Sequence, residues 1–141
     1  MTMLYNNSHL FSNSGAFVTL KGGALGHVWG DVTCGGKVPQ SVAKSLTKNV
    51  HLIYSTWRAF AALKRDGSVH AWGALSEGGS LTKKLNGIHF ICSNHVAFVA
   101  FEKSGTPYTW GHSLYGGVIS KNVSVALAQA NATFDNCPMN G

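Results

Sequence analysis

A hairpin pattern that recurs along the chain constrains the fold more than any other feature of this sequence. In its middle copy, residues 60–63 and 69–72 are short apolar runs joined by a polar connection that contains Asp66-Gly67. Asp-Gly is a turn pair, because glycine accepts positive φ without steric cost and aspartate bonds to the local backbone. The segment therefore predicts a β-hairpin whose second strand ends at Gly73.

The same pattern occurs three times in register. Each copy has a Phe, a Trp 12 positions later, a Gly directly after the Trp and a Gly-Gly pair that begins six positions after the Trp. The Phe positions are Phe17, Phe60 and Phe98, the Trp positions are Trp29, Trp72 and Trp110, and the pairs begin at Gly35, Gly78 and Gly116. Three upstream columns also align, namely Leu10, Ile53 and Ile91, then Phe11, Tyr54 and Cys92, then Ser12, Ser55 and Ser93. The spacing between successive Trp residues is 43 and then 38, and a period near 40 is typical of propellers and related stacked arrays.

The run that carries each Phe is apolar at consecutive positions, as in residues 60–63 and 98–101. Such a strand lies between two packed layers, and the frequent glycines argue against the alternative of a buried helix. We therefore expect one all-β repeat domain over residues 1–141, with units at about 7–49, 50–87 and 88–121. Alternating Val123, Val125 and Leu127 predict a partial strand within residues 122–141, followed by a tail. Propellers usually close with about four to eight blades, so three units predict a partial propeller or an open blade stack.

The middle hairpin also resembles a known repeat. The run Leu-Lys-Arg-Asp-Gly-Ser-Val at 63–69, followed by Trp72-Gly73, is similar to the repeat of the regulator-of-chromosome-condensation family of β-propellers. Similar hairpins occur in secreted propellers with short blades and in long repetitive proteins of microbes. The resemblance covers residues 7–123 and implies a propeller fold. Each unit has a Gly-Gly pair where the nuclear members carry Gly-Gln-Leu-Gly, so the resemblance transfers neither nucleotide exchange nor chromatin binding and assigns no functional residue.

The sequence predicts no catalytic, cofactor-binding or metal-binding residue. The five acidic residues do not recur as a pair, and no nucleophile elbow, phosphate loop or dinucleotide fingerprint is present. The seven histidines include no close set with cysteine or aspartate, and several occupy equivalent repeat positions. We expect instead a non-enzymatic module that binds another protein through its rim loops, with a secreted or surface effector as one version. The loops after each Trp-Gly differ between units, and Leu75, Leu114 and Tyr115 are the candidate contacts there.

A net charge of +6 raises the alternative of a basic nucleic-acid-associated protein, although the basic residues are spread along the chain in blocks of at most two. No stretch approaches the roughly 18 apolar residues of a membrane span. Residues 1–11 lack the basic start and apolar centre of a conventional signal peptide. The compartment is left open, and so is whether the natural chain is longer.

The three cysteines do not form a disulfide framework. Cys92 aligns with Phe11 and Tyr54, so we expect it to fill an apolar core position, while a Cys34–Cys137 disulfide is open but not indicated. Glycosylation is open too, because the acceptor pattern at Asn6, Asn122 and Asn131 occurs about as often as chance predicts.

The ends of a three-unit array pose a separate question, because three units cannot close a ring. We expect exposed apolar side chains on the outer faces of the first and third units, such as Phe17, Leu20, Phe98 and Phe101. Exposed apolar faces favour association into a homo-oligomer or a place within a longer array. The alternative is that residues 1–11 and 123–134 fold over these faces as caps.

Overall fold

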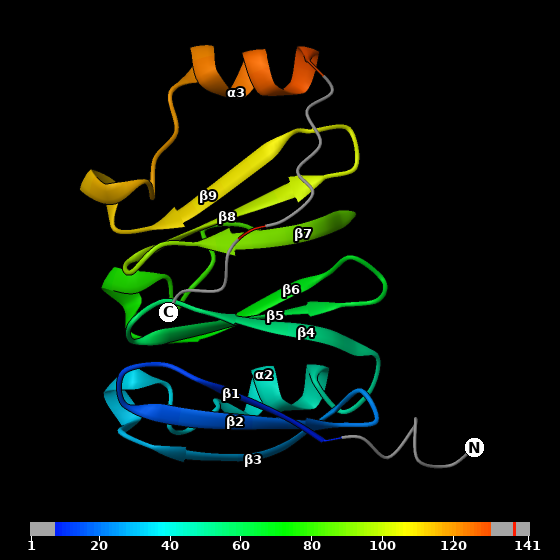
Figure 1. Cartoon of the computed structure of the whole chain (residues 1–141), viewed down its shortest axis with the longest axis vertical. Coiled ribbons are helices and arrows are strands. Elements are labelled where there is room, and N and C mark those ends of the chain that lie inside the picture. The colour runs from blue at the N-terminus through cyan, green and yellow to red at the C-terminus, as the bar shows by residue number, and fades with distance from the viewer. Residues whose placement is uncertain (1–7, 131–136, 138–141) are drawn as a thin grey trace.

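The computed structural model describes residues 8–130 and Cys137. These residues form three antiparallel sheets of three strands each, and Figure 1 shows the sheets layered one above another. The first sheet contains β1 (Ser8–Ser12), β2 (Ala16–Lys21) and β3 (Ala24–Gly30); the second contains β4 (Val50–Ser55), β5 (Ala59–Lys64) and β6 (Val69–Gly73); the third contains β7 (Ile88–Ser93), β8 (Ala97–Glu102) and β9 (Pro107–Gly111). The predicted fold class, all-β with three hairpin-bearing repeats in a partial propeller or open blade stack, is confirmed.

The three sheets share one register, which follows from their shared sequence pattern. The central strand begins with an Ala that pairs with the Gly after the Trp, as Ala59 pairs with Gly73. The Phe that follows lies opposite the Trp, and the ring centroids of the three Phe–Trp pairs are 5.3, 5.4 and 5.0 Å apart. The Asp-Gly turn of the second sheet has the positive φ that the sequence predicts, 86° at Gly67.

Two apolar clusters lie between the sheets and form the core. The first joins Ala16, Val18 and Leu20 of β2 to Phe60, Ala62 and Trp72 of the second sheet. The second joins Ala59, Ala61 and Leu63 of β5 to Phe98, Ala100 and Trp110 of the third sheet. Successive side chains of a strand point to opposite faces, so each central strand contributes to two interfaces. The Phe–Trp side of a sheet therefore packs against the preceding sheet, and the other side packs against the following one.

This direction corrects the prediction that both outer faces expose aromatic and aliphatic side chains. Phe17 is 41% exposed, as expected, whereas Leu20, Phe98 and Phe101 are buried. Phe17 is exposed because no described sheet precedes the first one, while Phe98 packs against the second sheet and Leu20 faces it.

Each Trp strand is followed by a short 3-10 helix: η1 (Val32–Cys34), η2 (Leu75–Glu77) and η3 (Ser113–Tyr115). Residues 8–130 also contain two α-helices, α2 (Gln40–Ser45) and α3 (Lys121–Gln129). None of the described helices has the length and apolar character needed to cross a membrane.

The helix α3 shows that the partial strand predicted after residue 121 is wrong. The Ser120 hydroxyl caps the helix by accepting a hydrogen bond from the Val123 N–H at 3.3 Å. A helix forms its backbone hydrogen bonds within one segment, whereas a strand must pair with another strand. The alternation of Val123 and Val125 therefore does not by itself make this segment a strand. Asn122 is exposed in this helix, while Asn6, Asn131 and all of the predicted tail except Cys137 lie outside the described residues.

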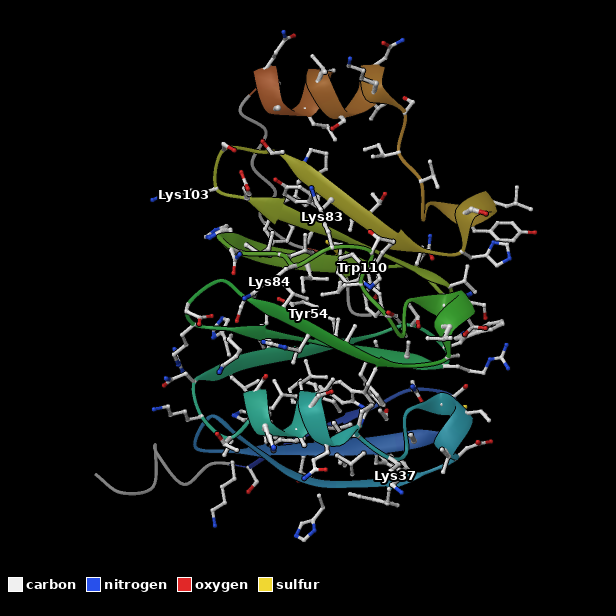
Figure 2. All side chains as sticks on the ribbon, turned by 180° about the vertical axis from the view of Figure 1, so that it is seen from behind. Lys37, Tyr54, Lys83, Lys84, Lys103 and Trp110 are labelled. Carbon is white, nitrogen blue, oxygen red and sulfur yellow. A yellow bond between two sulfur atoms is a disulfide. The ribbon has the colours of Figure 1, made fainter. Side chains whose placement is uncertain are left out.

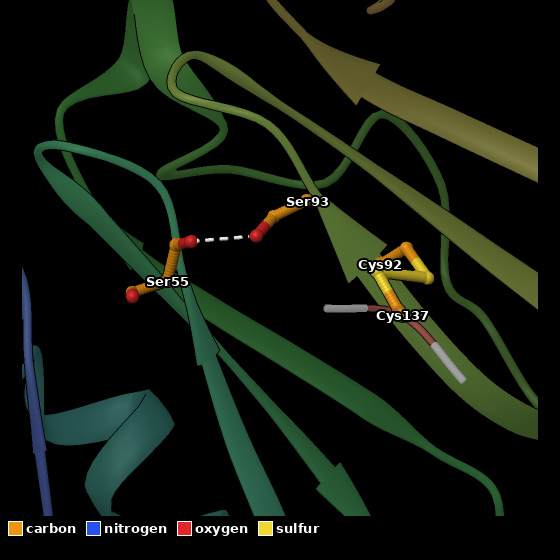
Figure 3. The surroundings of a disulfide bond; sticks show 4 residues. All are labelled: Ser55, Cys92, Ser93 and Cys137. Atoms are coloured by element: carbon orange, nitrogen blue, oxygen red, sulfur yellow. Dashed lines mark hydrogen bonds between the residues drawn. A yellow bond between two sulfur atoms is a disulfide. The ribbon is translucent and has the colours of Figure 1, made fainter. Parts of the chain in front are cut away.

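The cysteines also differ from the prediction. Cys92 forms a disulfide with Cys137, with Cα atoms 5.5 Å apart (Figure 3), and Cys34 is free and buried. The equivalents of Cys92, Phe11 and Tyr54, pack into the clusters between sheets. No described sheet follows the third, which leaves space beside Cys92 for the second cysteine.

Candidate functional site

One edge of the stack is formed by the three 3-10 helices and by the turns between the first two strands of each sheet, at residues 13–15, 56–58 and 94–96. The register that pairs Ala16 with Gly30 places each turn beside the 3-10 helix of its own sheet. Figure 1 shows the three 3-10 helices one above another at the left of the molecule. We call this surface the loop edge.

Equivalent side chains fix each 3-10 helix to its turn. The Asn13 amide donates to the Cys34 carbonyl at 2.7 Å, and the Asn94 amide donates to the Tyr115 carbonyl at 2.8 Å. In the second sheet the Thr56 hydroxyl replaces the amide and donates to the Glu77 carbonyl at 2.8 Å. The loops therefore have defined positions before any partner is bound.

Hydrogen bonds also join the turns of successive sheets. The Ser14 N–H donates to the Trp57 carbonyl at 3.0 Å, and the Trp57 N–H donates to the His95 carbonyl at 2.8 Å. The serine column adds a second connection, because Ser93 Oγ donates to the Ser55 carbonyl at 2.7 Å (Figure 3). The loop edge is consequently one continuous surface across the three sheets.

Large apolar side chains are exposed along this edge. The predicted contacts all lie here, with Leu75 on η2 and Leu114 and Tyr115 on η3. Leu75 is 76% exposed and Leu114 is 80% exposed. Val32 on η1 is exposed as well, so each 3-10 helix contributes at least one such side chain.

A shallow hollow of about 340 Å³ lies on the loop edge, lined by Trp57, Asn94, His95, Val96 and Tyr115. The Trp57 and His95 rings stack with centroids 4.4 Å apart and planes at 18°, although Trp57 is 53% exposed. Sequence reasoning missed both residues. The available signal was that Trp57 is the one tryptophan outside the repeated column and lies three residues before a column Phe, as His95 does.

The charged pair on this edge is structural. Arg58 donates from Nε and Nη2 to Glu77 Oε1 at 2.9 and 2.7 Å, and the buried Glu77 has no described hydrogen-bond partner for Oε2. The hydrogen bonds and charge of Glu77 raise the pKa of Arg58. On η1, the Thr33 hydroxyl and backbone N–H donate to Asp31 and lower the pKa of that carboxyl. Across the described residues no three His, Cys, Asp or Glu side chains form a group that could hold a metal ion.

The opposite edge carries the hairpin turns and is basic, and we call it the hairpin edge. Lys21, Lys64, Arg65 and Lys103 lie in or beside these turns. Figure 2 shows Lys103 at this edge, with Lys83 and Lys84 on the connection between the second and third sheets. Burial, followed by the nearby Lys64, lowers the pKa of His70. The Lys83 ammonium makes a cation–π contact with Tyr108, because its Nζ lies 4.3 Å from the centroid of that ring.

No protein-family model and no curated protein matches this chain. Similar solved structures include Prp20p from Saccharomyces cerevisiae, for which binding properties to Gsp1p and histones are described. Prp20p is 18% identical to this chain, with a TM-score of 0.53, and the match covers 81% of this chain and 33% of Prp20p. A second is yeast RCC1 (Prp20) bound to Kap60, which is 20% identical, with a TM-score of 0.48 over 73% of this chain and 29% of that chain. This chain thus spans about a third of the length of Prp20p. The likeness to Prp20p, together with the repeated Trp-Gly hairpin, shows that the chain folds as consecutive blades of an RCC1-like β-propeller.

Proposed function

We propose that this chain is a non-enzymatic protein-interaction module that binds a protein partner through the loop edge. The observation that carries the proposal is the exposure of Trp57, Leu75, Leu114 and Tyr115 on one continuous edge of the stack. Exposed apolar side chains that gather on one surface mark interaction sites more often than isolated ones do.

The chemistry of this edge suits a protein rather than a small ligand. Aromatic residues are the usual anchors of protein interfaces, and Trp57 and Tyr115 line the same hollow. The hollow is too shallow to enclose a small molecule, whereas a protein surface can cover it together with the 3-10 helices. The hydrogen bonds that hold the turns in place reduce the conformational entropy lost on binding. Prp20p, which shares the fold, has described binding properties to the proteins Gsp1p and histones, and this supports the same kind of partner.

A secreted or surface effector is the version of this function that the Cys92–Cys137 disulfide supports, since structural disulfides persist in oxidising compartments. A count of free thiols in the chain isolated from its natural source tests this version. One free thiol, at Cys34, is the expected result, and three free thiols would contradict it.

The binding proposal is tested by capture on the immobilised chain with quantitative mass spectrometry. The informative variant is Trp57→Ala/Tyr115→Ala, and the matched control is Trp29→Ala, an exposed tryptophan on the first sheet. Interface anchors contribute about 2 kcal/mol or more each. The double variant should therefore capture at least about tenfold less of the protein that the parent and the Trp29→Ala control both enrich. Equal retention by all three proteins would contradict the proposal.

The clustering of Lys21, Lys64, Arg65 and Lys103 on the hairpin edge favours nucleic-acid binding as the second candidate function. A salt titration of DNA and RNA binding separates the two functions. Phosphate neutralisation gives a fall of log K against log salt of about 0.9 per contacted phosphate on DNA. A steep slope that flattens in Lys64→Gln/Arg65→Gln would favour this candidate, while the absence of binding at low salt would remove it.

A further inference from the structure

The stack builds the same interface twice between its own sheets. In the first, the Trp72 Nε1–H donates to the Gly35 carbonyl at 3.0 Å. In the second, the Trp110 Nε1–H donates to the Gly78 carbonyl, also at 3.0 Å. Each Trp thus bonds to the glycine that ends the 3-10 helix of the preceding sheet.

The aromatic ring of the following sheet also lies directly on this glycine. A Cβ on Gly35 would lie 2.9 Å from Cδ2 of Phe60, and a Cβ on Gly78 would lie 2.5 Å from Cδ2 of Phe98. Both glycines are buried and have positive φ, at 91° and 99°. A glycine is needed at this position for the conformation and for the close approach of the ring.

The third sheet presents the glycine half of this interface without the aromatic half. Gly116 has the same conformation, with φ 103°, but it is exposed, and its ideal Cβ would approach only Asn94 and Ala97. A hollow of about 270 Å³ adjoins it, lined in part by Cys92, Ala97 and Val99. We call Gly116 and this hollow the glycine face.

The first sheet presents the aromatic half without the glycine. The Phe17 and Trp29 rings stack with centroids 5.3 Å apart, as in the buried pairs, yet Trp29 is 47% exposed. In the described part of the chain the Trp29 indole N–H has no acceptor, and Leu10 beside this pair is exposed. We call Phe17, Trp29 and Leu10 the aromatic face.

The helices support the equivalence of the two ends. α2 begins 11 residues after Trp29, and α3 begins 11 residues after Trp110. α2 contacts β6 of the following sheet, and its Val42 packs against the first apolar cluster. The equivalent side chain on α3, Val123, is exposed. α3 therefore has a free surface where α2 covers the next sheet.

We propose that two copies of this chain associate head to tail, with the aromatic face of one copy on the glycine face of the other. Trp29 Nε1–H then donates to the Gly116 carbonyl of the second copy, and Phe17 fills the hollow beside it. The occupant is a second copy because one chain carries both halves of an interface that it already forms twice internally. Two different surfaces meet in this interface, so the association is heterologous and continues until it closes into a ring or grows as a chain.

The Cys92–Cys137 disulfide competes with this association. Tyr54, the equivalent of Cys92 in the second sheet, packs into the cluster shared with the third sheet. Cys137 therefore lies where the first strand of a docked copy would pack. Reduction by a dithiol breaks the S–S bond with two electrons, giving two thiols on the chain and a disulfide on the reductant, and frees this face.

The test is light scattering over a dilution series of the oxidised chain, the dithiol-reduced chain and Cys137→Ser. The oxidised chain should remain at the monomer mass of 15.0 kDa, while the other two should increase in mass with concentration. In the Cys137→Ser background, Trp29→Ala removes the aromatic face and Val99→Arg blocks the glycine face. Neither variant should associate alone, but their equimolar mixture should give a one-to-one complex, while Leu52→Ala, an exposed position on the second sheet, should associate like its parent.

Each other outcome contradicts part of the proposal. Monomers in all three forms at the highest concentration, or association of Trp29→Ala equal to that of its parent, would overturn the docking. Equal association of the oxidised and reduced chains would overturn the competition with the disulfide. If Val99→Arg fails to fold, Val123→Arg on the exposed surface of α3 takes its place in the mixing experiment.

Discussion

Replacement of a column tryptophan gives the sharpest test of how the blades are held together. Trp72 is 1% exposed, its ring centroid lies 5.4 Å from that of Phe60, and its indole N–H donates to the Gly35 carbonyl at 3.0 Å. Trp72→Ala removes the contacts that join the first two sheets and leaves a buried carbonyl without its donor. Buried Trp→Ala changes cost about 3–5 kcal/mol, and the lost hydrogen bond contributes about 1 kcal/mol of that.

The matched control is Trp29→Ala, which changes the same residue type at the equivalent position. Trp29 is about half exposed and makes no such hydrogen bond within the described residues, so its loss should cost about 1–2 kcal/mol. The assay is urea unfolding of the oxidised chain at low protein concentration, followed by circular dichroism. Equal losses for the two variants, or a loss below about 1 kcal/mol for Trp72→Ala, would refute the direction of packing described above.

Three further predictions concern the hairpin turn, pH dependence and the buried carboxylate. Gly67→Val should destabilise the chain by about 1–3 kcal/mol, because φ is 86° and the new Cβ would lie 2.8 Å from the Gly87 nitrogen. The control is Gly87→Val, which should cost less in the same urea titration because no atom lies within 4 Å of its new Cβ. His70 has a lowered pKa in the folded state, so the unfolded chain binds more protons as pH falls below the ordinary value of 6.5, and the free energy of unfolding should decrease there. His70→Tyr should reduce that decrease between pH 7.5 and 5, as measured by urea titration at each pH, and an unchanged slope would contradict the assignment. Arg58→Met should lower the thermal midpoint of unfolding, because it leaves the Glu77 carboxylate buried without its partner. The double variant Arg58→Met/Glu77→Leu should recover part of this loss. No recovery would mean that the arginine acts through packing alone.

The repeated columns predicted the parts of the fold that depend on local pattern. The Asp66-Gly67 turn follows from the residue types at the turn, and the central strand apolar on both faces follows from apolar positions that recur at fixed spacing. The candidate contacts Leu75 and Leu114 lie in the segments after Trp-Gly, as the sequence predicts, and these segments form the exposed 3-10 helices η2 and η3.

The direction of stacking could not be predicted, because a column does not say whether its Phe faces the preceding or the following unit. For this reason the sequence predicts Phe98 on an outer face, whereas Phe98 packs against the second sheet. The Cys92–Cys137 disulfide was missed for a related reason, since it joins a repeat position to a segment outside the repeat. The spacing of Val123 and Val125 fits a period of two and so predicts a strand, whereas the segment forms α3, which Ser120 caps and which satisfies its backbone hydrogen bonds within itself.

The central claim is that the loop edge, and not the hairpin edge, binds the partner. Hydrogen exchange of the chain alone and in its captured complex measures this directly, because amides covered by a partner exchange more slowly. The account predicts added protection at residues 56–58, 75–77, 94–96 and 113–117, with residues 65–68 and 103–106 unchanged. Added protection confined to residues 65–68 and 103–106, with the loop edge unchanged, would contradict it.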